Sequence, residues 1–112
     1  MVLMDVLWLD SFFRGLQARS YNGGALVFSI THPCFWPEHY GYASADWFRY
    51  ERETIIESPF RISADRVGSL PSTHLHRPLS AYISALRRAG FILEMLEEPM
   101  PPLDVDAAYR AR

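Results

Sequence analysis

Polar side chains gather at the end of a short apolar segment. Residues 25–31 run Ala-Leu-Val-Phe-Ser-Ile-Thr, follow a Gly-Gly pair, and are followed by His32 and Pro33. So little alternation of polar and apolar residues, bounded by turn residues, predicts a strand buried on both faces of a parallel sheet. Ligands of open α/β sheets bind outside the carboxyl ends of the strands, where Ser29, Thr31 and His32 lie. His32 could accept a proton there during catalysis; the alternative is a loop histidine hydrogen-bonded to the backbone ahead of Pro33.

Two further groups of residues could bind a metal. Cys34 lies near His32 and His39, but this spacing matches no closed zinc pattern, and it favours a packed free cysteine. His74 and His76 alternate on an extended piece and therefore share one face. That pair could line a pocket or bind a metal, or it could be a solvated or pocket-wall pair. We expect no metal site.

Aromatic residues concentrate between Pro33 and Pro71. A stretch this long without a regular pattern is usually a lid or a binding insertion. Its rings could cap a small substrate, exclude water and tolerate a positive charge; alternatively they pack a satellite core under a long loop. Within the stretch, residues 50–60 predict a short antiparallel or edge strand, and 73–76 could pair with it. The aromatic residues are Phe35, Trp36, Tyr40, Tyr42, Trp47, Phe48, Tyr50 and Phe60.

Two helices are expected to position these groups. The first covers roughly residues 10–20, with Asp10 as its N-cap, and ends at the Gly-Gly turn. The second covers 79–89, with Gly90 as its C′ residue, and a strand at 91–96 follows it. The apolar stripes are Leu9, Phe12, Phe13 and Leu16 in the first helix, and Leu79, Tyr82, Ile83 and Leu86 in the second.

Arg77 precedes the second helix, next to the histidine pair. Its guanidinium could anchor an acidic group of a substrate. Pairing with Glu97 or Glu98 is an equally open interpretation.

Composition limits the possible classes of protein. A chain of 112 residues with 49% hydrophobic residues can bury one core, as one domain or part of one. All eleven basic residues are scattered arginines and the net charge is −2, so no basic stripe for nucleic acid is present. The single cysteine excludes an internal disulfide and fits a reducing compartment. With neither a signal-peptide pattern nor an apolar run of spanning length, we expect a cytoplasmic protein without nucleic-acid or membrane partners.

Four blocks of sequence, in this order, resemble the C-terminal half of a class I S-adenosylmethionine-dependent methyltransferase of the type 11, small-molecule group. The resemblance covers nearly the whole chain. It implies one partial domain over 1–112 with an α/β fold: half of a Rossmann-like sheet, flanking helices, and an aromatic-rich β insertion at 33–76 that caps the substrate. The blocks are MVLMDV at 1–6, GGALVFSITHPCF at 23–35, HRPLSAY at 76–82, and AGFILEMLEEP at 89–99.

The resemblance also implies site residues. The opening block follows the fourth strand and passes the cofactor, so Val2, Leu3 and Asp5 are expected to contact S-adenosylmethionine. His32 is expected to take a proton from the methyl acceptor, a small molecule. The expected substrate contacts are Phe35, Trp36, Tyr40, Trp47, Tyr50 and His76.

The residues that hold most of the cofactor in this family are missing from the sequence. No GxGxG motif occurs, so S-adenosylmethionine should bind weakly or not at all to this chain alone. Methyl transfer would therefore belong to a complete domain. The alternative is a non-catalytic fragment or interaction module, and unpaired sheet edges favour self-association in either case.

Overall fold

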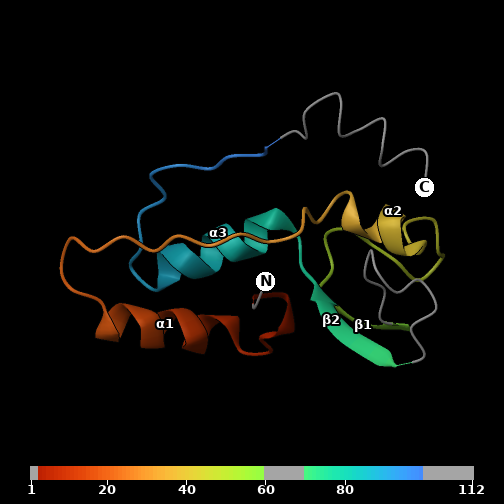
Figure 1. The fold of residues 1–112 in the computed structure, drawn as a ribbon, viewed down its shortest axis with the longest axis horizontal. Coiled ribbons are helices and arrows are strands. Elements are labelled where there is room, and N and C mark those ends of the chain that lie inside the picture. Colours follow the sequence, from red (N-terminus) through yellow and green to blue (C-terminus); the bar gives the residue numbers. More distant parts are fainter. Residues whose placement is uncertain (1–2, 60–69, 100–112) are drawn as a thin grey trace.

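A computed structural model describes residues 3–59 and 70–99 (Figure 1). Helices and strands both occur, as predicted, but the two strands form an antiparallel pair and the described residues contain no parallel sheet. No helix of the described part is long and apolar enough to span a bilayer. In chain order the elements are the 3-10 helix η1 (Leu3–Asp5), α1 (Leu9–Arg19), α2 (Trp36–Tyr40), β1 (Thr54–Pro59), β2 (Pro71–His76) and α3 (Leu79–Arg88).

Helix α1 forms where the apolar spacing predicts a helix, but its start differs from the prediction. Trp8 holds the N-cap position without a side-chain cap, so Asp10 is not the cap. Asp10 lies inside the first turn, where its carboxylate accepts a 2.8 Å hydrogen bond from Nε of Arg88 at the end of α3. The Arg88 guanidinium lowers the pKa of Asp10 from its ordinary value.

Helix α3 ends in the predicted glycine cap. Gly90 adopts a left-handed conformation with φ 91°, which costs a glycine little. Its N–H donates to the Arg87 carbonyl at 3.0 Å, and the Phe91 N–H donates to the Leu86 carbonyl at 3.0 Å. This pair of bonds is a Schellman motif, and it turns the Phe91 ring toward Phe13, 6.4 Å away between ring centroids.

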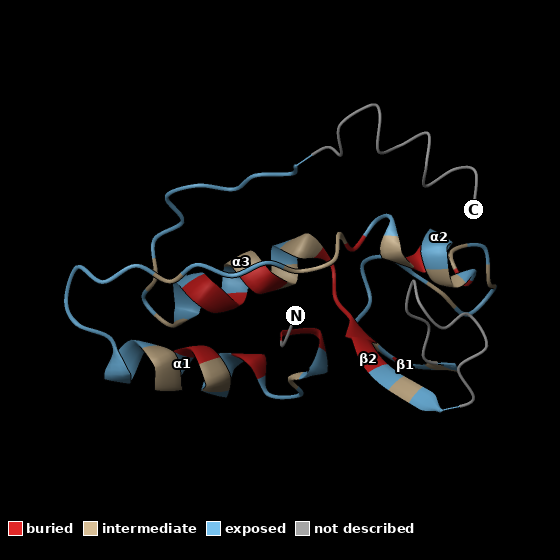
Figure 2. Cartoon of the chain, in the orientation of Figure 1, coloured by how far each residue is buried: buried red, intermediate tan, exposed pale blue. Residues whose placement is uncertain are grey.

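The hydrophobic core lies between α1 and α3. The two helices run side by side, and their buried residues face each other (Figures 1 and 2). Phe13 is at its centre and has no exposed surface. The 3-10 helix closes one end through Leu3. The buried members are Leu3, Leu9, Phe13, Tyr82, Ala85 and Leu86.

The predicted strands at 25–31 and 91–96 are not strands in this structure. Both segments are extended, yet neither pairs with another described segment. Side chains alternate between the two sides of an extended segment, so Leu26 and Ile30 lie on the same side and pack on the core, whereas Val27 is 90% exposed. The prediction that residues 25–31 are buried on both faces was therefore wrong, because the described residues supply neither a neighbouring strand nor a second layer of helices.

The predicted antiparallel pairing in the aromatic insertion is confirmed. Strand β1 pairs with β2 in a register that runs from Thr54 opposite His76 to Pro59 opposite Pro71. The two prolines lack N–H donors, which suits them to the end of the ladder. The hairpin thus brings His76 and its neighbours to the start of α3.

Arg77 joins this hairpin to the N-terminal turn. It is 2% exposed, and its guanidinium donates to the carbonyls of Leu3, Val6 and Leu7 at 3.2, 2.6 and 3.0 Å. Its Nε lies 3.1 Å from Oε2 of Glu53, at an angle that makes an ion pair rather than a hydrogen bond. The hypothesis that Arg77 pairs with Glu97 or Glu98 is therefore wrong, because three backbone acceptors and Glu53 surround it.

We expect Arg77→Met to lower the free energy of unfolding by about 2–4 kcal/mol, because buried carbonyls lose their donors while the aliphatic volume is kept. Urea denaturation followed by circular dichroism measures the change. Arg87→Met is the matched control: Arg87 is exposed near the end of α3, and a change within 0.5 kcal/mol or so is expected there. Equal effects of the two substitutions would contradict the structural role of Arg77.

Candidate functional site

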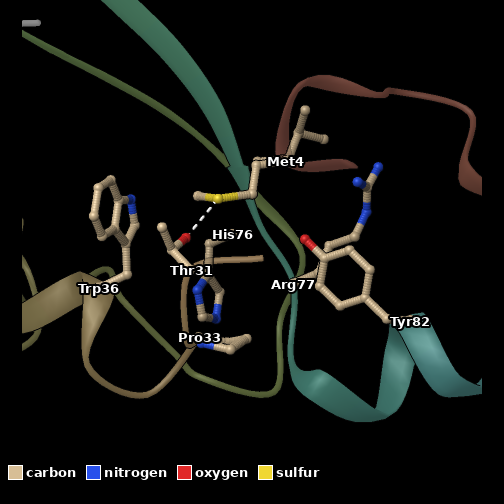
Figure 3. Close-up of a pocket in the computed structure, with 8 residues that line it drawn as sticks. Met4, Thr31, Pro33, Trp36, His76, Arg77 and Tyr82 are labelled. Carbon is tan, nitrogen blue, oxygen red and sulfur yellow. Dashed lines mark hydrogen bonds between the residues drawn. The ribbon is translucent and has the colours of Figure 1, made fainter. Parts of the chain in front are cut away.

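A small cavity lies where η1, the end of the 25–31 segment, α2 and β2 meet (Figure 3). Its volume is about 10 Å³, close to the minimum that holds one water. A pocket for a substrate has at least about thirty times this volume, so the cavity has room for one small group only. Its lining consists of Met4, Thr31, Pro33, Trp36, Leu75, His76, Arg77 and Tyr82.

Helix α2 was not predicted from the sequence, and it positions two of the aromatic side chains. It has five residues, with Pro37 in its first turn and Gly41 at its end in a left-handed conformation with φ 78°. The Tyr42 N–H donates to the Pro37 carbonyl at 3.0 Å and closes the turn. Trp36 and Tyr40 consequently lie against each other, with ring centroids 4.7 Å apart.

An aromatic cluster packs against β2. The Tyr40 ring lies 5.3 Å from the His74 ring, and the Phe48 ring lies 4.7 Å from the His76 ring. Tyr42 joins the two parts, since it contacts both His74 and Phe48. The cluster consists of Trp36, His39, Tyr40, Tyr42, Trp47, Phe48, Tyr50, His74 and His76.

His76 and Tyr50 tie the cluster to α3. Nε2 of His76 donates to the Tyr50 carbonyl at 2.8 Å, which assigns the ring proton to that nitrogen. The Tyr50 hydroxyl accepts the backbone N–H of Leu79 at 3.1 Å, at the first turn of the helix. His76 and Tyr50 were expected to contact the substrate, and both therefore also connect the cluster to the rest of the fold.

His74 is the buried titratable group of the cluster. Its Nε2 lies 3.1 Å from the Tyr42 hydroxyl, and the two groups share a hydrogen bond. Burial lowers the pKa of His74; Asp5 opposes this shift and His76 adds to it. Burial also raises the pKa of Tyr42 to about 12. Both groups are therefore neutral near pH 7.

His32 makes a hydrogen bond at each ring nitrogen. Nδ1 accepts a hydrogen bond from the backbone N–H of Cys34 at 3.2 Å, and Nε2 is hydrogen-bonded to Oε1 of Glu98. Because Nδ1 is an acceptor, Nε2 carries the proton and donates to the carboxylate. Neither nitrogen has a free lone pair in this arrangement. A hydrogen bond to the backbone beside Pro33 was one of the two alternatives from the sequence, and proton acceptance by His32 stays a prediction.

The structure brings some of the predicted site residues together and separates others. Trp36, Tyr40, Trp47, Tyr50 and His76 belong to the cluster. Of the other predicted residues, Phe35 is 71% exposed and lies against His32, Leu3 is buried in the core, Asp5 is exposed, and Val2 lies outside the described residues.

Other members of the cluster were not among the predicted contacts. Tyr42, Phe48 and His74 were singled out only as aromatic or paired residues. The two-residue spacing of the histidines was the signal for His74, because it puts both rings on one face of β2. Within residues 3–59 and 70–99, no three side chains of His, Cys, Asp or Glu converge as metal ligands.

The buried state of His74 predicts a stability that falls in acid. An unfolded histidine has a pKa near 6.5, and the folded value is lower, so the unfolded state binds the proton first as the pH falls below about 6.5. We expect the loss between pH 7 and 5 to approach, at most, about 1.4 kcal/mol per pH unit from this residue.

Urea denaturation across this pH range measures the effect in the wild type, in His74→Gln and in His39→Gln. The His74 variant should lose part of the pH dependence, whereas the variant of exposed His39 should keep it. Equal pH dependence in all three proteins would contradict the assignment.

No protein-family model, curated protein or solved structure matched this chain. The function is therefore inferred from the residues, their geometry and the four sequence blocks.

Proposed function

We propose that this chain forms the C-terminal half of a Rossmann-like, S-adenosylmethionine-dependent methyltransferase domain and acts, in the complete domain, in methyl transfer to a small molecule. The observation that carries this proposal is the convergence of the sequence blocks. Met4 of the first block, Thr31 of the second and His76 of the third line one cavity (Figure 3). Glu98 of the fourth block contacts His32 of the second. Blocks far apart in the chain thus meet at one site.

The arrangement of the helices supports the same proposal. Helices α1 and α3 form one layer, and Leu26, Ile30 and Phe91 of the extended segments pack against it. The opposite side of the segments, with Val27 and Ile92, is open. A sheet with helices on both faces would have this half-covered form if one layer were removed.

The residues at the site have distinct tasks in this proposal. Bound S-adenosylmethionine would supply the methyl group and the leaving group, so the protein contributes mainly proximity and orientation. The aromatic cluster would form an apolar wall beside the methyl acceptor, with ring faces that tolerate the positive sulfonium. His32 would receive, at Nδ1, the proton that the acceptor loses, once this nitrogen releases the Cys34 N–H, and Glu98 would then stabilise the charged ring.

The described residues fit the cofactor only in part. Asp5 is exposed on η1, next to β2, and is free to contact a ligand, but Leu3 is used in the core. The sequence has no Gly-rich loop to hold the methionine moiety. The few contacts that remain would have to offset the free-energy cost of association, which is roughly 4–15 kcal/mol.

Calorimetric titration of the 112-residue chain with S-adenosylmethionine should consequently give a Kd of about 1 mM or weaker. Low-micromolar binding would show a sufficient site and contradict the half-domain proposal. The genomic sequence upstream of the Met1 codon supplies the second arm. An in-frame Gly-rich loop there is expected, and the longer protein should bind saturably. In that protein, Trp36→Ala should reduce methyl transfer more than cofactor binding.

An interaction module is the second candidate, because a specific observation favours it. The open side of the extended segments exposes Val27 and Ile92 at 90% and 88%. None of the N–H groups of residues 25–31 or 92–96 donates to a backbone carbonyl within the described part of the chain. Exposed apolar side chains beside free backbone groups favour pairing with another strand.

We expect the isolated chain to self-associate in sedimentation experiments at micromolar concentration. The double variant Val27→Lys and Ile92→Lys should shift it toward monomer, since charge on an open strand discourages pairing. Ser84→Lys, on the exposed side of α3, is the matched control. A compact wild-type monomer with a sharp thermal transition would argue against open pairing surfaces.

A further inference from the structure

The indole nitrogen of Trp36 is a buried donor at the cavity. Nε1 has less than 1 Å² of exposed surface, and no described residue accepts its hydrogen. A buried N–H without an acceptor is costly, and a tryptophan N–H usually finds one. The cavity is therefore bordered by an unused hydrogen-bond donor.

The group in front of this donor is a poor acceptor that can move. Figure 3 shows the nitrogen edge of the Trp36 indole facing the Met4 thioether, with Thr31 beside it. The Thr31 hydroxyl donates to Sδ of Met4. Thioether sulfur accepts hydrogen bonds only weakly, and the unbranched methionine side chain adopts several conformations. An oxygen ligand could thus displace Met4 and take both donors.

The other polar groups around the cavity are donors that already have partners. The Arg77 side chain is also in the lining, but its guanidinium is engaged by three carbonyls of the N-terminal turn and by Glu53. Nε2 of His76, also in the lining, is a donor already engaged by Tyr50. The two donors left for a ligand, Trp36 Nε1–H and the Thr31 hydroxyl, match a carboxylate oxygen, because charged acceptors form the stronger hydrogen bonds.

We propose that the cavity is a subsite for one carboxylate oxygen of a small organic acid, with Trp36 Nε1–H and the Thr31 hydroxyl as donors and Met4 as the displaceable group. About 10 Å³ admits a single oxygen, so the rest of the ligand would remain outside or fill the space that Met4 leaves. That this acid is also the methyl acceptor rests on the proposed function. That the cavity binds an acid does not.

Indole N–H resonances in nuclear magnetic resonance test the proposal on the chain as it is. Sodium acetate is the probe and acetamide is its neutral counterpart. Trp8 and Trp47, which are 75% and 54% exposed, act as internal controls, and Trp36→Phe assigns the Trp36 signal. We expect acetate to shift the Trp36 signal selectively and saturably, with acetamide at least several-fold weaker.

Two variants and one control substitution sharpen the test. Thr31→Val should weaken acetate binding roughly tenfold, the usual value of one hydrogen bond, while Thr73→Val, at an exposed position of β2, should leave it unchanged. Met4→Ala should tighten binding if its spectrum stays dispersed. The proposal is wrong if acetate leaves the Trp36 signal unmoved or shifts all three indole signals alike. It is also wrong if acetamide binds equally well, or if the Trp36 N–H shows only proton exchange with a bound water. These results do not depend on methyl transfer, so they separate this subsite from the proposed activity.

Discussion

The buried guanidinium of Arg77 is the interaction on which the rest of the described structure depends. It satisfies three carbonyls of the N-terminal turn and an ion pair with Glu53 at the same time. Arginine suits this position because its planar group presents five donors and stays charged. His76 precedes it in β2 and Pro78 follows it before α3. One side chain therefore joins the turn, the hairpin and the helix around the candidate site.

The aromatic cluster combines packing with polar contacts that few cores tolerate. His74 and His76 point into rings, yet each finds a hydrogen-bond partner, in the Tyr42 hydroxyl and the Tyr50 carbonyl. Satisfied polar groups of this kind specify one arrangement of the side chains, because any other arrangement would leave them unpaired. Trp36 differs from these residues in having an unused donor, which makes it the candidate contact for a ligand.

Local patterns were predicted well from the sequence. Helix α3 with its Gly90 cap, helix α1, and the β1–β2 pairing follow from apolar spacing and turn residues close in the chain. Features that depend on distant partners were not. The apolar run at 25–31 indicated an extended segment but not what would cover it, and the backbone acceptors of Arg77 lie 70 to 74 positions away. Helix α2 is too short for its periodicity to be detected.

The long separation of the Arg77 contacts affects how the chain can fold. The Leu3 carbonyl and its donor are 74 positions apart, and closing a loop of that length costs about 4 kcal/mol of chain entropy. On a ribosome, the N-terminal turn emerges before the hairpin and has to wait for Arg77 to be synthesised. The core between α1 and α3 likewise needs both ends of the described chain. Protection of this nascent turn and of α1 from proteases and aggregation would therefore begin only after Arg77 and α3 have emerged.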